Sequence, residues 1–174
     1  MTGNARQIRL ILSDVDGVMT DGKIIYSERG TETKEFSARD GFGIRLWIKS
    51  GGLFGIVTGR SSSVVKMRAD ELGVHALRQG IQNKAETARQ ICEAFNVPLE
   101  ETAFIGDDYP DLPAMKIVGF PAAVADAAEE IRASAVWVSD FAGGKGAVRQ
   151  LIETILKARN QWSSALQFYR EGKP

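Results

Sequence analysis

Apolar positions along the chain fall into short uninterrupted runs, separated by segments with helical periodicity. Runs of this kind are typical of strands that are buried on both faces of a parallel sheet. We expect strands at residues 8–13, 53–58, 75–80, 102–107, 119–125 and 136–140. We expect helices at residues 40–52, 61–73, 83–96, 110–118, 126–135 and 146–162. Because strands alternate with helices, the sequence predicts an α/β, Rossmann-like, mostly parallel sheet with right-handed crossovers and helices on both faces.

Residues 23–37 do not fit this alternation and are typical of an antiparallel β-hairpin. The tetrapeptide SERG at 27–30 supplies turn residues between two extended segments. No internal repeat and no linker rich in proline or serine interrupts the chain. We therefore expect residues 1–174 to form a single domain, with a hairpin flap at about 23–37 and a C-terminal tail at about 160–174.

The composition excludes several classes of partner. Apolar residues make up 44% of the 174 residues and charged residues 25%, the balance of a globular protein. Lys plus Arg equals Asp plus Glu at 22 each, so no global basic field recruits nucleic acid or an anionic membrane. We expect neither as a partner.

The single cysteine, Cys92, excludes an internal disulfide and suits a reducing compartment. No apolar stretch precedes the first expected strand, so we expect no signal peptide. No run approaches the ~20 apolar residues that a membrane span needs. These features together predict a cytoplasmic protein.

Reactive side chains follow several of the expected strands. Asp14 and Asp16 come after the first strand, Thr58 ends the second, Asp107 ends the strand at 102–107, and Lys84 opens the helix after 75–80. In open α/β sheets the carboxyl ends of the strands meet at one edge, where ligands bind. Carboxylates with room for waters and a phosphate favour Mg²⁺ over zinc or calcium. The sequence therefore predicts a magnesium site at this edge.

Four segments carry a resemblance to a known family. The stretches DVDGVMTDG, VTGR and IGDDYPD, and a lysine after QGIQN, are similar to the four motifs of the haloacid-dehalogenase superfamily of phosphatases. They occur in the family's order, each at an expected strand end. Asp108 matches a neighbouring acidic position of the fourth motif, for which the resemblance implies a supporting role.

The resemblance implies a role for each remaining motif residue. Asp14 would be the nucleophile, and Asp16 the general acid and base. Thr58 and Lys84 would hold the phosphoryl oxygens. Asp107 would bind Mg²⁺ together with Asp14 and the main-chain carbonyl of Asp16.

The chemistry explains why these residue types are needed. A phosphate dianion approaches an aspartate only where positive charge offsets the repulsion, and Mg²⁺ and Lys84 supply that charge. Attack by Asp14 gives an aspartyl-phosphate, which divides one difficult displacement into two easier steps. Asp16 protonates the leaving alkoxide and then activates the hydrolytic water.

The spacing of the motifs leaves no room for an inserted cap domain. The hairpin and one helix fill the segment between Asp16 and Thr58, and the segment between Thr58 and Lys84 is shorter still. This arrangement resembles the capless subclass, whose hairpin builds a homotetramer in which each protomer covers its neighbour's site. The alternative for residues 23–37 is an ordinary surface hairpin.

Within that subclass the chain most resembles the family that acts on 3-deoxy-D-manno-octulosonate 8-phosphate (KDO 8-phosphate), a precursor in lipopolysaccharide biosynthesis. The matching stretches include FSARDGFGI, MRADELG and AGGKGAVRQ. Arginines suit a substrate with both a carboxylate and a phosphate, because each anion can pair with them bidentately. The implied substrate-binding residues are Asp16, Ser37, Ala38, Arg39, Asp40, Gly41, Arg45, Gly59, Arg60, Arg68 and Lys84.

Alternatives remain open for the substrate and for the arginines. Sister enzymes that act on the nine-carbon 2-keto-3-deoxynononic acid (KDN) 9-phosphate tend to carry Glu where this chain has Arg60, which favours the eight-carbon acid. Arg45 alternatively pairs with a carboxylate on its own helix, and Arg68 with Glu71. The glycine-rich stretch 141–147 is either a flexible loop or a lid. Residues Trp162, Phe168 and Tyr169 of the tail either gate a neighbouring site or pack on the surface.

A receiver-like signalling domain is the main rival from another class. Receivers also place aspartates, Mg²⁺, a hydroxyl and a lysine around a phosphoaspartate. Their acidic pair comes before the acceptor aspartate, however, whereas here the Asp-Asp pair follows Thr58 and Lys84. Asp16 also has no counterpart in a receiver. An inactive homologue is disfavoured because every catalytic side-chain type is present.

Overall fold

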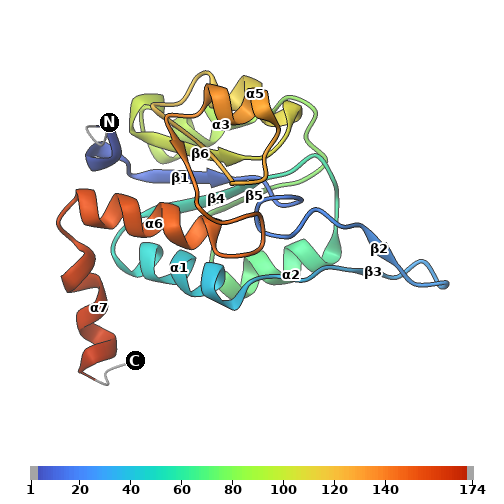
Figure 1. Ribbon diagram of the computed structural model, residues 1–174, viewed down its shortest axis with the longest axis horizontal. Helices are drawn as coiled ribbons and strands as arrows, with labels where there is room; N and C mark the ends of the chain where they lie inside the picture. The colour runs from blue at the N-terminus through green and yellow to red at the C-terminus, as the bar shows by residue number, and fades with distance from the viewer. Residues whose placement is uncertain (1–3, 172–174) are drawn as a thin grey trace.

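A parallel sheet forms the centre of the computed structural model, which describes residues 4–171 (Figure 1). Within these residues the sheet has six strands in the order β5-β4-β1-β6-β7-β8, and every neighbouring pair is parallel. The strands are β1 (Leu10–Ser13), β4 (Leu53–Val57), β5 (Ala76–Arg78), β6 (Thr102–Gly106), β7 (Phe120–Ala123) and β8 (Trp137–Val138). The predicted α/β fold class is confirmed.

Helices cover both faces of this sheet. In Figure 1 helices α1, α2 and α6 lie against one face, and α3 and α5 lie against the other. The helices are α1 (Ala38–Lys49), α2 (Ser63–Leu72), α3 (Lys84–Phe95), α4 (Leu112–Met115), α5 (Glu129–Ser134), α6 (Ala147–Ala158) and α7 (Trp162–Arg170). Short 3-10 helices lie at Asn4–Gln7, Leu99–Glu101 and Tyr109–Asp111.

Burial of β1 explains why its sequence has no polar alternation. All four residues of β1 are buried, because strands lie on either side of it and helices cover both of its faces. The fully buried side chains around it include Trp47 of α1, Phe54 of β4 and Phe104 of β6. This packing fixes the end of β1, from which the catalytic segment departs.

Side-chain caps set where the helices begin. The Ser37 hydroxyl accepts a hydrogen bond from the Asp40 amide, so α1 begins at Ala38 rather than at the expected residue 40. The Asn83 side chain accepts from the amide of Glu86 at 3.0 Å, which starts α3 at Lys84. This cap fixes Lys84 in the first turn, close to the carboxyl ends of the strands.

The single long helix predicted at 146–162 is wrong in extent. Helix α6 ends at Ala158, Asn160 has a positive φ of 57°, and α7 begins at Trp162. A residue with positive φ cannot continue a right-handed helix. Helix α7 therefore leaves α6 at an angle, and the Arg149 guanidinium lies 5.5 Å from the Trp162 ring centre at this joint.

The hairpin is present and shorter than its predicted range. Strands β2 (Ile25–Tyr26) and β3 (Glu32–Thr33) pair antiparallel, and the Gly30 amide donates to the Ser27 carbonyl at 2.9 Å in the expected turn. Figure 1 shows the hairpin projecting from the edge where the strands end. Among residues 4–171, no helix has the length and apolar character that crossing a bilayer requires.

Candidate active site

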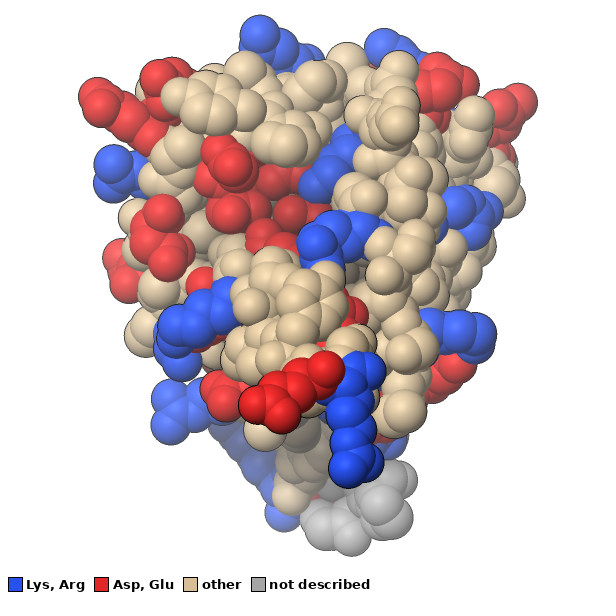
Figure 2. Space-filling view, turned by 90° about the vertical axis from the view of Figure 1, so that its right-hand side faces the viewer, with Lys and Arg blue, Asp and Glu red and all other residues tan. Residues whose placement is uncertain are grey.

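A crevice of about 300 Å³ opens at the carboxyl ends of β1, β4 and β6. Figure 2 shows acidic side chains gathered in a hollow on this face of the molecule, with basic side chains beside them. All six residues predicted for the catalytic motifs meet here, as expected for strand ends of a parallel sheet. The crevice is lined by Asp14, Asp16, Gly22, Thr58, Gly59, Arg60, Lys84, Asp107, Asp108, Pro110 and Asp111.

Lys84 is a buried cation between two carboxylates. Its ammonium nitrogen lies 2.8 Å from Asp14 Oδ1 and 2.6 Å from Asp111 Oδ1. Burial alone lowers the pKa of Lys84, but Asp14 and Asp111 outweigh it and raise the pKa above its ordinary value. Lys84 therefore carries its charge at neutral pH, within reach of the predicted nucleophile.

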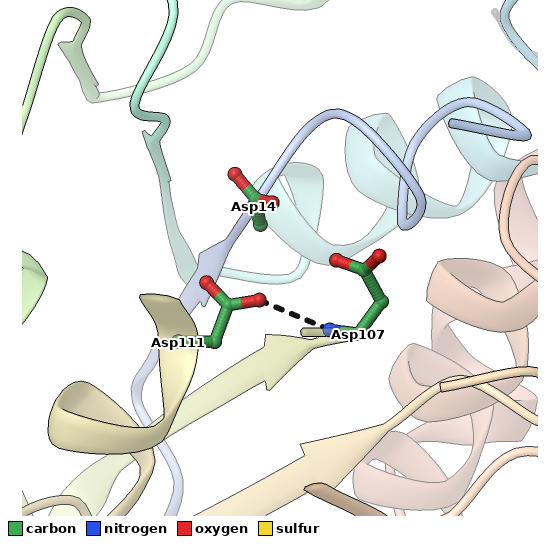
Figure 3. Close-up of side chains that lie close together, drawn as sticks. All are labelled: Asp14, Asp107 and Asp111. Carbon is green, nitrogen blue, oxygen red and sulfur yellow. Dashed lines mark hydrogen bonds between the residues drawn. The ribbon is translucent and has the colours of Figure 1, made fainter. Parts of the chain in front are cut away.

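Asp111 is a site residue that the sequence analysis did not assign. It is buried, and its second oxygen, Oδ2, accepts a hydrogen bond from the Asp107 amide at 3.0 Å (Figure 3). Gly106 makes room for it, since a β-carbon there would lie 2.5 Å from the Asp111 β-carbon. The signal was available in the stretch IGDDYPD, where the tight 3-10 turn returns the last aspartate to the strand end.

Three carboxylates surround a space that suits a divalent cation. One oxygen each from Asp14, Asp107 and Asp111 lies within 4.8 Å of the others. Apart from its ion pair with Lys84, the buried Asp14 Oδ1 has no hydrogen-bond partner among the described residues. Since both oxygens of Asp111 are already engaged, Asp14 and Asp107 have the free ligand capacity. The residues present therefore fit Mg²⁺.

The electrostatics of the cluster support the same conclusion. Burial, and then the charge of Asp111, raise the pKa of Asp14 to about 6. Burial and the charges of Asp111, Asp14 and Asp108 raise the pKa of Asp107 to about 8. Carboxylates repel one another at this range in a poorly hydrated site, and a bound cation removes that repulsion.

Asp16 lies at the junction between the crevice and the hairpin. Its carboxylate pairs with the buried ammonium of Lys34 and lies 3.6 Å from Arg60 Nε. Arg60 Nη2 donates to the Tyr26 hydroxyl at 2.7 Å and to Glu32 at 2.9 Å. The hydrogen bonds to Tyr26 and Glu32 raise the pKa of Arg60 above its ordinary value. Lys34, Tyr26 and Glu32 were not expected at the site.

Thr58 and its neighbour complete the floor of the crevice. Thr58 is buried directly after β4, and its hydroxyl accepts from the Arg60 amide at 3.4 Å. Gly59 lies between them and lines the crevice. Asp108 also lines it, and its carboxylate accepts from the Tyr109 amide at 2.8 Å, which starts the 3-10 turn carrying Asp111.

The remaining residues predicted to bind substrate lie outside this crevice in the protomer. Ala38, Gly41, Arg45 and Arg68 line a separate cavity of about 540 Å³ between α1, α2 and α7. Arg68 pairs there with Glu71 at 2.9 Å, the alternative pairing that the helix spacing allowed. The structure thus divides the predicted site into two groups of residues.

The other three members of the stretch 37–41 do not line the crevice. The Ser37 hydroxyl caps α1, and Arg39 lines a groove beside α6. Asp40 is buried, and its carboxylate accepts from the amides of Gly146 and Arg149 at the start of α6. Asp40 therefore ties the stretch 37–41 to the start of α6, and a role of this stretch in binding substrate stays a prediction.

The glycine-rich stretch packs against the catalytic segment. The Gly144 amide donates to the Val18 carbonyl at 2.9 Å. A β-carbon on Gly143 would lie 1.8 Å from the Gly17 carbonyl oxygen. The Asp126 carboxylate accepts from the Gly143 amide at 2.9 Å and holds the stretch in place. These contacts support the loop after β1 from behind.

Comparison with known proteins agrees with this geometry. A family model described as haloacid dehalogenase-like hydrolase matches residues 76–152. The 3-deoxy-D-manno-octulosonate 8-phosphate phosphatase of Yersinia pestis is 40% identical over 161 residues, which cover 92% of this chain and 86% of the relative. That of Escherichia coli K12 gives the same values of 40%, 92% and 86%.

Solved structures of phosphatases with the same name are also similar to this chain. The phosphatase of that name from Moraxella catarrhalis, in complex with magnesium, phosphate and KDO, is 39% identical with a TM-score of 0.94 and covers 97% of both chains. The cobalt-bound form of the Haemophilus influenzae enzyme is 33% identical with a TM-score of 0.91, covering 97% of this chain and 98% of that one.

Proposed function

The chain belongs to the haloacid dehalogenase-like hydrolases, in the family of the 3-deoxy-D-manno-octulosonate 8-phosphate phosphatases, and on this premise we propose that it hydrolyses KDO 8-phosphate to KDO and phosphate. The observation that carries the proposal is the placement of Asp14 at the end of β1, beside the Lys84 ammonium and the Asp107 carboxylate. KDO then feeds lipopolysaccharide synthesis. We assign this activity to one domain spanning residues 1–174.

The first half-reaction uses Asp14 and Asp16. An Asp14 carboxylate oxygen forms a bond to phosphorus while the bond from phosphorus to the sugar oxygen breaks. Asp16, which lies in the turn that follows β1, gives its proton to that oxygen as it leaves. Lys84 and Thr58 bind the phosphoryl oxygens, and the Lys84 charge stabilises the negative charge that spreads over them.

The second half-reaction releases phosphate. Asp16, now a carboxylate, takes a proton from water while the water oxygen attacks phosphorus and the bond to Asp14 breaks. Asp14, Asp107 and the main-chain carbonyl of Asp16 would hold Mg²⁺, which when bound would offset the negative charge of the carboxylates and of the phosphoryl group. Asp111 holds Lys84 and the Asp107 amide in place throughout.

The two groups of arginines suggest how the rest of the substrate is bound. Arg60 lines the catalytic crevice, and we propose that its guanidinium pairs with an anionic group near the phosphate. Arg45 and Arg68 line the separate cavity and are proposed to complete the crevice of a neighbouring subunit. The exposed Ile24, Ile25 and Tyr26 of the hairpin support the predicted homotetramer, because exposed apolar side chains on a projecting hairpin gain stability from burial.

A panel of phosphate esters tests the activity. Phosphate release is measured from KDO 8-phosphate, KDN 9-phosphate and common hexose phosphates, with Mg²⁺ and with EDTA, and Asp14→Asn serves as the inactive control. We expect metal-dependent release from the eight-carbon ester above all others and none from the variant. Faster release from the nine-carbon ester would keep the mechanism and overturn the substrate, in particular the interpretation of Arg60.

Two further expectations accompany the activity. Light scattering should give the mass of four chains, and a monomer that remains fully active would contradict the shared-site arrangement. We also propose a cytoplasmic location, supported by the free, buried thiol of Cys92, which persists in a reducing compartment. Stable phosphorylation of Asp14 without turnover of any ester would favour the receiver-like alternative.

A further inference from the structure

Lys34 is a buried charge outside the family's catalytic motifs. It follows β3, in the segment that leads from the hairpin to α1, and its side chain is 0% exposed. Burying an ammonium is costly unless a partner compensates it, so the partner indicates what the residue does. That partner is the carboxylate of Asp16, with the carboxylate of Glu32 3.7 Å away on the other side.

The hairpin presents one polar face to the crevice. Glu32 and Lys34 are two positions apart in an extended segment, so their side chains point the same way. Tyr26 is paired with Glu32 across the two strands and shares that face. This face contacts Asp16 through Lys34 and contacts Arg60 through Glu32 and Tyr26. The hairpin is thereby linked to the acid/base residue within the same chain.

We propose that Lys34 is a positioning residue that holds the Asp16 carboxylate in the orientation needed for proton transfer to the leaving oxygen and from the hydrolytic water. The proposal rests on the function assigned above, in which Asp16 is the general acid and base. Asp16 is only 17% exposed, and its other nearby cation, Arg60, lies at 3.6 Å and is already bound to Glu32 and Tyr26. Lys34 is therefore the group that fixes the Asp16 side chain.

A defect that acts through Asp16 has a recognisable kinetic form. An aryl phosphate such as p-nitrophenyl phosphate has a leaving group that departs without protonation, so phosphorylation of Asp14 proceeds without Asp16. Hydrolysis of the aspartyl-phosphate still needs Asp16 to activate water. With the aryl ester, loss of Lys34 therefore slows the second half-reaction alone, whereas with a sugar phosphate it slows both.

The test is rapid mixing of Lys34→Met with each substrate in the presence of Mg²⁺. We expect kcat on KDO 8-phosphate to fall about 100-fold, in the range that general acid–base catalysis contributes. With p-nitrophenyl phosphate we expect a burst of nitrophenolate of about one equivalent per active site, followed by slow turnover. The rate of the burst should stay within about threefold of wild type, since phosphoryl transfer to Asp14 is unaffected.

A double-mutant cycle identifies the residue through which Lys34 acts. In an Asp16→Asn background, the added Lys34→Met change should alter kcat by less than about threefold, because both changes remove one function. Lys34→Arg keeps the cation and should restore much of the lost kcat. Lys23→Met is the matched control, because Lys23 is also a hairpin-segment lysine but is 73% exposed and pairs with Asp21. It should leave both substrates unaffected.

Three results would overturn the proposal. Equal losses on the aryl and sugar esters, with no burst, would mean that Lys34 supports phosphoryl transfer or the fold itself. A raised KM with unchanged kcat would mean that it binds substrate directly. Independent, multiplying effects of Lys34→Met and Asp16→Asn would mean that it does not act through Asp16.

The experiment separates this proposal from the proposed function. If wild type releases no phosphate from KDO 8-phosphate, the substrate assignment fails, and the same contrast is run with whichever alkyl phosphate the enzyme hydrolyses. Thermal unfolding confirms that each variant is folded. If Lys34→Met is unfolded, Lys34→Gln, which keeps a polar group at the position, is used in the same cycle.

Discussion

Substitution of Asp111 is the most informative single change, because Asp111 holds Lys84 in place but is neither the nucleophile nor the general acid. Its carboxylate accepts from Lys84 Nζ at 2.6 Å and from the Asp107 amide at 3.0 Å. In Asp111→Asn one oxygen can still accept from Asp107, but the amide nitrogen then faces the Lys84 ammonium. Two donors meet at that contact, so the buried charge-assisted hydrogen bond is lost and nothing replaces it.

The expected losses of stability and of kcat follow from this geometry. A hydrogen bond to a charged group contributes about 1.5–3 kcal/mol, and we expect a loss near the upper end because two donors then face each other, although Lys84 keeps its ion pair with Asp14. At about 2–4 °C per kcal/mol for a chain of this length, Tm should fall by roughly 5–10 °C. We also expect kcat to fall about 10- to 100-fold, because Lys84 is no longer held at its distance from Asp14.

The substitution also changes the pH dependence in a defined direction. The charge of Asp111, after burial, is a cause of the raised pKa of Asp14. Removing it lowers the pKa of Asp14 in the metal-free protein from about 6, so the fall of Tm in EDTA between about pH 4 and about pH 6 should become smaller.

The assay combines thermal unfolding of Asp111→Asn in EDTA across this pH range with kcat measured in Mg²⁺ at neutral pH. Asp70→Asn is the control, since Asp70 pairs with Lys66 on the surface with both side chains at least 65% exposed. Loss of that pair should cost less than about 1 kcal/mol and leave activity unchanged. An Asp111→Asn protein with wild-type Tm and wild-type kcat would refute the reasoning.

Three further predictions concern the metal site, the glycine-rich stretch and the start of α6. Burial and neighbouring charges raise the pKa of Asp107 to about 8, so Tm in EDTA should fall as pH rises from about 5 to about 8. The affinity for Mg²⁺ should rise over the same pH range, because the metal binds the deprotonated carboxylate. An affinity that does not change with pH would contradict this. Gly143→Ala should abolish most activity, because the added β-carbon would lie 1.8 Å from the Gly17 carbonyl oxygen. Gly30→Ala is the control, because a β-carbon there meets nothing within 4 Å. It should lower the free energy of unfolding, measured in urea, by about 1 kcal/mol through the positive φ alone. Asp40→Ala removes both hydrogen bonds to the α6 amides and should lower the free energy of unfolding by about 2 kcal/mol, while an unchanged urea midpoint would show that the cap contributes nothing.

The catalytic crevice was predictable because its residues follow strands. Asp14, Thr58 and Asp107 stand directly after apolar runs, and parallel strands bring their carboxyl ends to one edge whatever the details of packing. Lys84 was predictable from the Asn83 cap that starts its helix. The structure places all four of these side chains in one crevice.

Other parts depend on side-chain directions that sequence spacing does not reveal. Asp111 reaches the crevice because a 3-10 turn brings it back toward the strand, and Lys34 because the extended segment after β3 turns it inward. Arg45 and Arg68 lie on helix faces that open into a different cavity. The break between α6 and α7 depends on one left-handed residue, Asn160, within a pattern that otherwise continues.

The contacts of the C-terminal tail could not be predicted from the sequence either. Trp162 and Tyr169 pack within their own chain, the first beside Arg149 and the second with its ring centre 4.8 Å from that of Phe42. The side chain of Phe168 and residues 172–174 lie outside the described part of the structure. Gating of a neighbouring site by the tail stays a prediction.

Trapping the covalent intermediate tests the central claim most directly. Asp16→Asn enzyme is mixed with Mg²⁺ and p-nitrophenyl phosphate, whose leaving group needs no protonation, and is then quenched in acid within the first turnover, digested and mapped by mass spectrometry. We expect a phosphoryl group on the peptide that carries Asp14, accumulating because the hydrolytic water is no longer activated. A phosphoryl group on another residue, or continued turnover by Asp14→Asn, would contradict it.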